Sequence, residues 1–212
     1  YEVVVVMDQK DWKGPAGEAI KSELASSVPG LPQAEPSLKI TYVQPKDFTG
    51  LLRYVRNILV VTIDPTAYTK VSVGYENNVW ARGQVVVSLK APNTESIVEY
   101  SKTHEKALVD FFVKVEMNRA IEQLQKEYSM VVMDNLKSDL NVMLNAPANF
   151  TYYKDTTDFF WSSNNANTGR MDLIVYTFPY TDPNTFTEEY LVAKRDSVLK
   201  ANLPGSFPGS YM

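Results

Sequence analysis

The stretch NTESIVEYSKTHEKALVDFFVKVEMNRAIEQLQKEYSMVVMDNLKSDLNVML, residues 93–144, decides the fold that we predict. It contains neither proline nor glycine, and its apolar side chains recur at three- and four-residue steps. This is the period of an amphipathic α-helix. A straight helix of this length would reach about 78 Å, more than the width of a compact domain of this mass. We therefore expect one long or kinked central helix, with the break near Ser129–Asp134, where apolar residues become contiguous.

Short apolar runs on both sides of this stretch are typical of β-strands. The predicted strands are Glu2–Met7, Leu38–Val43, Asn57–Ile63, Gln84–Leu89, Phe150–Lys154 and Met171–Phe178. Two more helices are predicted over Asp11–Ser27 and Thr185–Ala201. The side chains expected in the core are Val4, Val6, Leu24, Ile40, Leu59, Val61, Val86, Leu108, Phe111, Leu124, Leu173 and Val175.

The order strand, helix, strand, strand occurs twice, over residues 1–65 and 84–179. Local residues agree, since Ile40-Thr-Tyr matches Phe150-Thr-Tyr, although the matches need small gaps and chance similarity is the alternative. We expect a single α+β domain over residues 1–212. It would have a mainly antiparallel sheet with helices on one face, built from two related β-α-β-β, ferredoxin-like units.

The composition excludes several classes of protein. Acidic and basic residues are mixed along the chain at a net charge of -4, without a basic cluster, so no nucleic-acid partner is expected. The absence of cysteine excludes thiol catalysis, thiolate metal sites and disulfides. Apolar runs such as Val3–Met7 are too short to span a bilayer.

Both ends of the sequence suggest a longer natural protein. Tyr1 begins a strand-like run, so we expect that a leader or targeting signal ahead of it has been removed. Val28-Pro-Gly leads from the first helix to a strand, and Leu203-Pro-Gly after the last helix is followed only by residues up to Met212. We therefore expect the natural protein to continue beyond this point.

Catalytic and metal-binding motifs are missing from the sequence. His104 is the only histidine, which excludes a multi-histidine metal site, and we expect it to pack on the long helix. No Gly-x-Ser-x-Gly motif and no glycine-rich phosphate-binding motif occurs. No catalytic residue, metal ligand or cofactor is therefore assigned.

The richest candidate for binding is the segment Tyr152–Arg170. Its aromatic residues Tyr153 and Trp161 and its amides Asn164 and Asn165 are the mixture that stacks on and hydrogen-bonds a sugar or peptide. The alternative, which we favour, is that Phe159, Phe160 and Trp161 are core and that 164–169 is a hairpin loop.

Two carboxylates in the same segment allow a catalytic alternative. Asp155 and Asp158 stand beside aromatic residues, a combination that can hydrolyse glycosides. The hypothesis is a carboxylate-based hydrolase acting on an envelope glycan, with its site near Asp155–Trp161. Carboxylate pairs of this kind are also common on solvated loops.

A second candidate lies at Trp80 and Arg82, just ahead of a predicted buried strand. An arginine beside a tryptophan can bind an acidic or planar ligand. More often such a pair anchors the edge of a sheet to the core.

Several motifs together carry a resemblance to a known family. They are Tyr1-Glu-Val-Val-Val-Val6, Trp12, Leu31-Pro-Gln-Ala-Glu-Pro36, Arg56-Asn-Ile-Leu59 and Trp80-Ala-Arg-Gly-Gln84. In this order they resemble an uncharacterised domain-of-unknown-function family of predicted envelope lipoproteins from Bacteroidetes. The resemblance implies a lipid anchor upstream of Tyr1 and a place in the cell envelope, and it implies no activity and no catalytic residues.

The function we expect is that of a non-enzymatic, exported module that binds a partner protein or a glycan of the cell envelope. The hydrolase near Asp155–Trp161 is the first alternative. A purely structural domain that positions another assembly is the second. Aromatic side chains exposed in a row would favour glycan binding, a deep pocket holding Asp155 or Asp158 would favour the enzyme, and a broad apolar patch would favour protein assembly.

Overall fold

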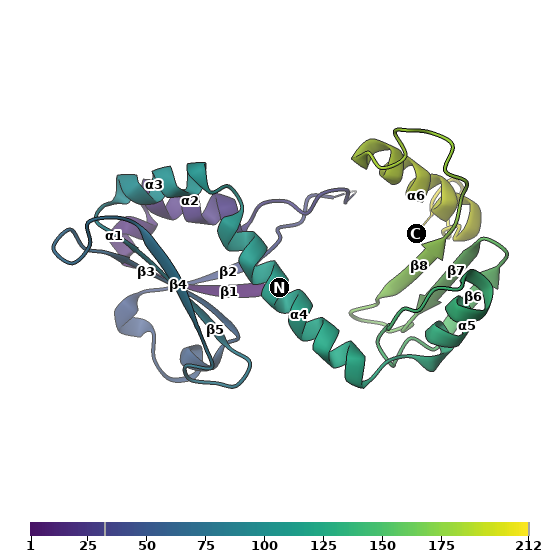
Figure 1. Ribbon diagram of the computed structural model, residues 1–212, viewed down its shortest axis with the longest axis horizontal. Helices are drawn as coiled ribbons and strands as arrows, with labels where there is room; N and C mark the ends of the chain where they lie inside the picture. Colours follow the sequence, from purple (N-terminus) through teal and green to yellow (C-terminus); the bar gives the residue numbers. More distant parts are fainter. Residues whose placement is uncertain (32, 212) are drawn as a thin grey trace. The chain divides into compact units, whose positions relative to one another are not determined.

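The structure is a computed structural model that describes residues 1–31 and 33–211. Residue 32, a proline of the turn predicted after the first helix, and residue 212 lie outside this description. The chain folds into two compact units, residues 1–119 and 120–212 (Figure 1). Their boundary falls inside one helix, and each unit is described by itself.

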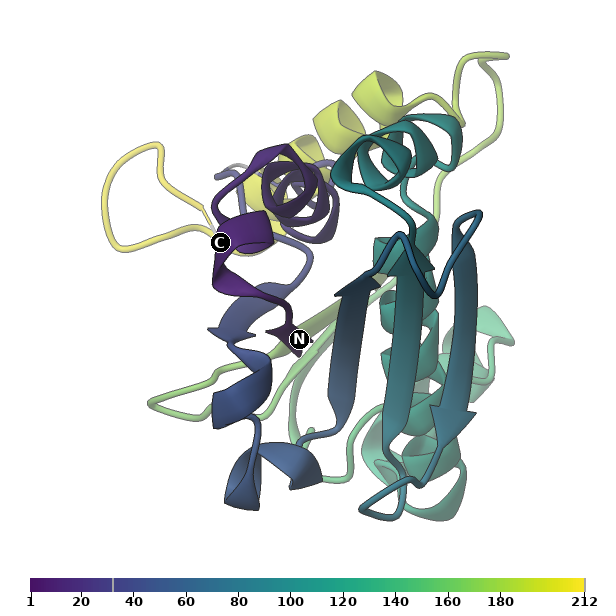
Figure 2. The same cartoon turned by 90° about the vertical axis from the view of Figure 1, so that its left-hand side faces the viewer.

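Unit 1 is built on a five-stranded sheet. Its strands are β1 (Glu2–Val6), β2 (Lys39–Val43), β3 (Asn57–Ile63), β4 (Ser72–Asn77) and β5 (Val85–Ala91). Their order is β2-β1-β3-β5-β4. In Figure 2, β3, β5 and β4 run side by side, with the arrow of β4 opposite to the other two.

The expectation of a mainly antiparallel sheet is wrong for unit 1. β1 pairs parallel with β2 and β3, β3 pairs parallel with β5, and the edge strand β4 alone is antiparallel to its neighbour among these strands. Parallel strands covered on both faces carry near-continuous apolar runs, and Val3–Met7 is such a run. The run predicts burial on both faces but does not encode the direction of its partners.

Each face of this sheet has its own apolar core. Helices α1 (Gln9–Trp12), α2 (Pro15–Leu24) and α3 (Thr94–Thr103) precede α4 (Ala107–Lys126). One core joins strand residues such as Val5 and Leu59 to Ile20 of α2, Ile97 of α3 and Phe112 of α4. The other core, with Val4 and Ile58, is covered by Phe48 and Leu52, which lie beside or within the short 3-10 helices η1 (Pro45–Asp47) and η2 (Gly50–Tyr54). Burying a large side chain in this way contributes about 1.5–3 kcal/mol.

The long helical stretch divides into three helices, α3, α4 and α5 (Met130–Leu140). The break predicted near Ser129–Asp134 is present but lies slightly earlier, over residues 127–129, and residues 130–134 are helical. Ser129 caps α5 by accepting a hydrogen bond at Oγ from the amide of Val132 (3.3 Å). A second break, over residues 104–106, was not predicted. Lys106 adopts a positive φ of 64° there, and the Glu23 carboxylate accepts the amide of Leu108 at 2.7 Å. Burial raises the pKa of Glu23.

Unit 2 contains a three-stranded antiparallel sheet of β6 (Tyr152–Thr156), β7 (Phe159–Ser163) and β8 (Asp172–Tyr176), followed by α6 (Glu188–Asn202). One face packs on α5, where Val132 and Leu136 contact the buried Phe160.

Strand β7 was not predicted. The ferredoxin-like repeat is not confirmed, because β5, the expected first strand of the second copy, pairs in the sheet of unit 1. What the structure shows is a mixed α+β protein with one mixed and one antiparallel sheet.

A buried polar network attaches α4 to the amino end of β3. Asn57 donates through Nδ2 to the Glu2 carbonyl (2.9 Å) and to Oε1 of Glu116 (2.8 Å). Arg119 donates through Nη1 to the Asn57 amide oxygen (2.7 Å) and to the same Glu116 oxygen (2.6 Å). Asn57 and Glu116 are buried, so their polar groups are satisfied inside the protein.

Replacing Arg119 by methionine is expected to destabilise unit 1 by about 3–5 kcal/mol, because the buried Glu116 carboxylate then loses its cation. Lys114→Met, at an exposed position of the same helix, should change the free energy of unfolding by less than about 0.5 kcal/mol. Urea unfolding followed by tryptophan fluorescence in a Trp161→Phe background, where Trp12 and Trp80 report on unit 1, measures both. Equal midpoints for the two variants would contradict the role of the network.

Candidate binding site

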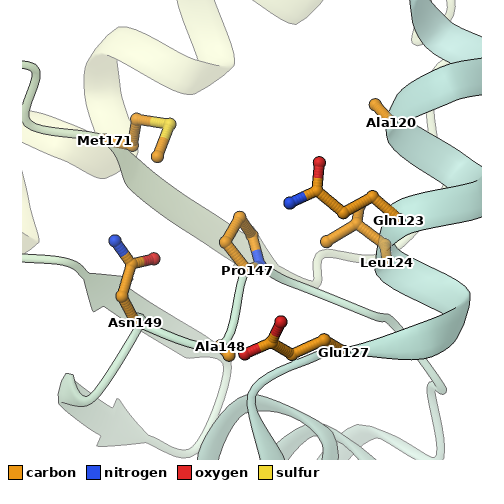
Figure 3. A pocket seen from close by; sticks show the side chains of 8 residues that line it. All are labelled: Ala120, Gln123, Leu124, Glu127, Pro147, Ala148, Asn149 and Met171. Atoms are coloured by element: carbon orange, nitrogen blue, oxygen red, sulfur yellow. The ribbon is translucent and has the colours of Figure 1, made fainter. Parts of the chain in front are cut away.

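A cavity of about 460 Å³ opens on the surface of unit 2. Figure 3 shows one wall formed by the end of α4 and the coil after it, with Met171 and Asn149 on the opposite side. Pro147 lies between the two walls. The lining residues are Ala120, Gln123, Leu124, Glu127, Pro147, Ala148, Asn149 and Met171.

The segment 145–150 is fixed by hydrogen bonds to the end of α4 and to the N-cap residue of α5. Asn145 donates through Nδ2 to the carbonyl of Leu124 (3.0 Å), and the amide of Ser129 donates to the carbonyl of Ala146 (2.9 Å). Ala146 and Phe150 are both buried in the core of unit 2. The residues between them, 147–149, are therefore held in place while they line the cavity.

The lining combines apolar contact surface with exposed polar side chains. Leu124 and Pro147 are half-buried, and Met171 is exposed beside them. The polar side chains of Gln123, Glu127 and Asn149 are exposed, and they make no hydrogen bond or ion pair within the described residues. Pockets with an apolar floor and a few free polar groups are the usual form of a ligand site.

None of these lining residues was predicted as functional from the sequence. They come from the end of α4, from coil and from the residue just before β8, and no motif links them. The one available signal was the spacing of Ala120, Leu124 and Glu127, which places them on one side of the helical stretch.

One hollow of unit 1 has polar side chains that are already hydrogen-bonded within the unit. A cavity of about 430 Å³ is lined in part by Glu2, Asn57 and Glu116. Asn57 and Glu116 belong to the buried network described above, and Glu2 accepts a hydrogen bond from the Thr41 hydroxyl (2.9 Å). The unit 2 cavity is therefore a better candidate for a ligand than this hollow.

The two predicted aromatic ligand residues lie on opposite faces of the unit 2 sheet. The register pairs Tyr153 with Ser162 and Lys154 with Trp161, so Tyr153 and Trp161 point to different sides. The Trp161 indole donates to Asp172 Oδ1 (3.0 Å), and the Arg170 guanidinium lies 5.9 Å from its ring. The row of exposed aromatic side chains that would favour glycan binding is not formed by this pair.

The predicted amides lie in the loop between β7 and β8. Asn164 accepts at Oδ1 from the amides of Ala166 (3.2 Å) and Met171 (3.0 Å), and it donates through Nδ2 to Gly169 (3.3 Å). Asn165 adopts a positive φ of 46°. This is the hairpin loop of the alternative interpretation, and the Asn164 side chain is used to hold it together.

Trp80 lies at the end of the sheet in unit 1 and is held by Gln84. The buried Gln84 amide accepts from the amide of Trp80 (3.0 Å) and donates to the carbonyls of Arg53 (2.6 Å) and Val55 (2.7 Å). Trp80 also packs edge-on against Phe48 at 5.6 Å. These contacts give Trp80 an anchoring role, whereas Arg82 is exposed beside it.

Gln84→Ala is expected to reduce the free energy of unfolding by about 1–3 kcal/mol, because it leaves the carbonyls of Arg53 and Val55 without their donor. Arg82→Ala should change it by less than about 0.5 kcal/mol, since the side chain is exposed. Both are measured by urea unfolding followed by circular dichroism. A stability loss for Arg82→Ala as large as that for Gln84→Ala would show that the anchor has been misplaced.

The carboxylate pair of unit 2 is not the pair expected from the sequence. Asp155 shares a hydrogen bond with Asp139 of α5, whereas Asp158 accepts one from the Thr177 hydroxyl (3.2 Å). Neither Asp155 nor Asp158 lines the cavities described above. The hydrogen bond with Asp139, together with burial and the Asp139 charge, raises the pKa of Asp155. The Ser138 hydroxyl and Asp155 lower the pKa of Asp139.

Asp155→Asn is expected to raise the melting temperature at neutral pH. The raised pKa means that Asp155 favours folding only where it is protonated, so its contribution is lost as the pH rises through that pKa. An asparagine cannot ionise and can donate an N–H to Asp139. The difference in melting temperature between the variant and the unaltered chain should therefore disappear on acidification towards about pH 4, where Asp155 is protonated. Differential scanning calorimetry over this pH range measures the effect.

Asp158→Asn is the matched control, because it removes a carboxylate from the same hairpin without touching Asp139. An equal and pH-independent shift in both variants would contradict the coupling of Asp139 to Asp155.

Neither a metal-binding cluster nor a membrane-spanning helix is found among the described residues. Within the described residues, no group of three or more His, Asp or Glu side chains is arranged to hold a metal ion. No helix in the same part of the chain has the length and apolar character needed to cross a bilayer.

Two models of known protein families match the chain. The model of the family described as Domain of unknown function (DUF8532) matches residues 1–125. The chain belongs to this family. A second model, Domain of unknown function (DUF4837), matches residues 129–212, which include α5, the sheet of unit 2 and α6. No curated protein and no solved structure matches the chain. The expected membership in a family of unknown function is confirmed at this level.

Proposed function

We propose that this chain is a non-enzymatic binding module of the cell envelope, and that the cavity of unit 2 holds a segment of a partner protein. The observation that carries the proposal is the lining of the cavity. It offers free amide and carboxylate groups over an apolar floor, without a nucleophile placed next to a base. Such a lining supports recognition rather than bond cleavage.

A protein ligand fits the lining better than a glycan. Sugars are usually held against a flat aromatic ring, and the cavity is lined by none. Leu124, Pro147 and Met171 instead offer aliphatic and thioether surface, which adapts to apolar side chains. The amides of Gln123 and Asn149 can donate to and accept from a peptide backbone.

The place of the module in the envelope is proposed from the family resemblance. The motifs Tyr1-Glu-Val-Val-Val-Val6 and Trp80-Ala-Arg-Gly-Gln84 support an exported protein held at the membrane by a lipid anchor upstream of Tyr1. In this arrangement the partner is another envelope protein, and nucleic acid has no part, because basic residues do not cluster along the sequence.

Filling the cavity tests the proposal. Ala120→Trp places a large side chain in the lining, whereas Gln125→Trp places the same side chain at an exposed position of α4 that does not line the cavity. The full chain and both variants are assayed against an array of immobilised short peptides of varied sequence and against soluble peptidoglycan fragments. Ala120→Trp is expected to weaken peptide binding by about tenfold or more, which corresponds to about 1.4 kcal/mol.

Gln125→Trp should bind like the unaltered chain. Peptidoglycan binding that is lost in Ala120→Trp alone would favour the glycan ligand and overturn the protein proposal. Equal peptide binding by both variants would show that the cavity is not the binding site.

A further inference from the structure

Among the described residues that line the unit 2 cavity, Glu127 alone has an ionisable side chain. It is exposed and forms no ion pair within the described residues, and its sequence neighbour Lys126 does not line the cavity. Figure 3 shows its carboxylate beside Ala148 and below Pro147. A lone carboxylate without a cation in the same cavity favours a positively charged ligand group.

The net charge of unit 2 also favours a positively charged ligand. Residues 120–212 contain seven Lys and Arg and eleven Asp and Glu, which gives a net charge of -4. Residues 1–119 contain fourteen of each and are neutral. The whole excess of negative charge therefore belongs to the unit that holds the cavity, and it attracts a basic partner over a distance of about 10 Å at moderate salt.

The apolar part of the lining narrows the class of cation. Leu124, Pro147 and Met171 form surface that an inorganic ion would leave exposed, and the cavity has too few oxygen ligands around Glu127 to hold a metal. Lysine and arginine carry a cation on an aliphatic stem, and such stems lie along apolar surface while the charged end stays in water.

We infer that the cavity of unit 2 receives a lysine or arginine side chain of the partner, with its stem on Leu124, Pro147 and Met171 and its cation at Glu127. The inference rests on the proposed function. The amide oxygens of Gln123 and Asn149, which line the same cavity, can accept the remaining N–H groups of the cation.

The test uses four blocked pentapeptides that differ only at the central residue, which is lysine, arginine, norleucine or glutamate between glycines. Binding to the full chain is followed by chemical-shift changes of the backbone amides in nuclear magnetic resonance. We expect the lysine and arginine peptides to shift the amides of residues 120–127, Ala148 and Asn149. They should bind about two- to fivefold tighter than the norleucine peptide, as for an exposed ion pair.

Glu127→Gln should abolish this preference while keeping the shape of the cavity. Glu122→Gln is the matched control, because it removes the same charge from an exposed position of α4 that does not line the cavity. It should leave the preference for lysine and arginine in place.

The outcomes separate the inference from the proposed function. If norleucine binds at the cavity as tightly as lysine, the site is a peptide site without charge selection and only the inference is overturned. If Glu122→Gln abolishes the preference as fully as Glu127→Gln does, the charge acts from the whole surface, and the assignment to Glu127 is wrong. If no peptide shifts the cavity amides, the proposed function fails together with the inference.

Discussion

The burial of β1 on both faces is the constraint on which unit 1 depends. Val3–Met7 is almost fully buried, and both neighbouring strands run parallel to it. A parallel neighbour cannot be reached by a tight turn, so the chain must cross a face of the sheet after β1 and again after β2. The first crossing contributes α2 to one core, and the second contributes η1 and η2 to the other. The two cores follow from one strand.

At the start of β3 the same sheet buries a polar side chain, that of Asn57, which needs hydrogen-bond partners. The side chain of Asn57 is drawn into the interior at the start of β3, where an unpaired amide would cost about 1–3 kcal/mol. Glu116 and Arg119 satisfy it from the same helix, one turn apart, and they compensate each other's charge. A buried ion pair of this kind adds little net stability over apolar packing, but it admits few alternative positions of the helix.

The sequence was sufficient for most elements of the fold and insufficient for their pairing. The apolar periods predicted the helical stretch, six strands near their observed positions and buried residues such as Leu24 and Leu59. They could not predict the parallel pairing of β1, because a β-branched run fits either direction. The break at 104–106 was missed for a similar reason, since the cap of α4 comes from Glu23, far away in the sequence.

The candidate site shows why composition is a weak guide to function. Asn164 and Trp161 were selected for their chemistry, yet their polar groups are used within the loop and with Asp172. The polar groups without a partner in the described chain are on Gln123, Glu127 and Asn149. These are ordinary residues on two separate segments, and only the fold brings them to one cavity. Exposed polar groups can hydrogen-bond to water, so the lack of a protein partner does not by itself identify a ligand site. What distinguishes this group is its convergence on a shared apolar floor, where a ligand can replace that water and bury Leu124 at the same time.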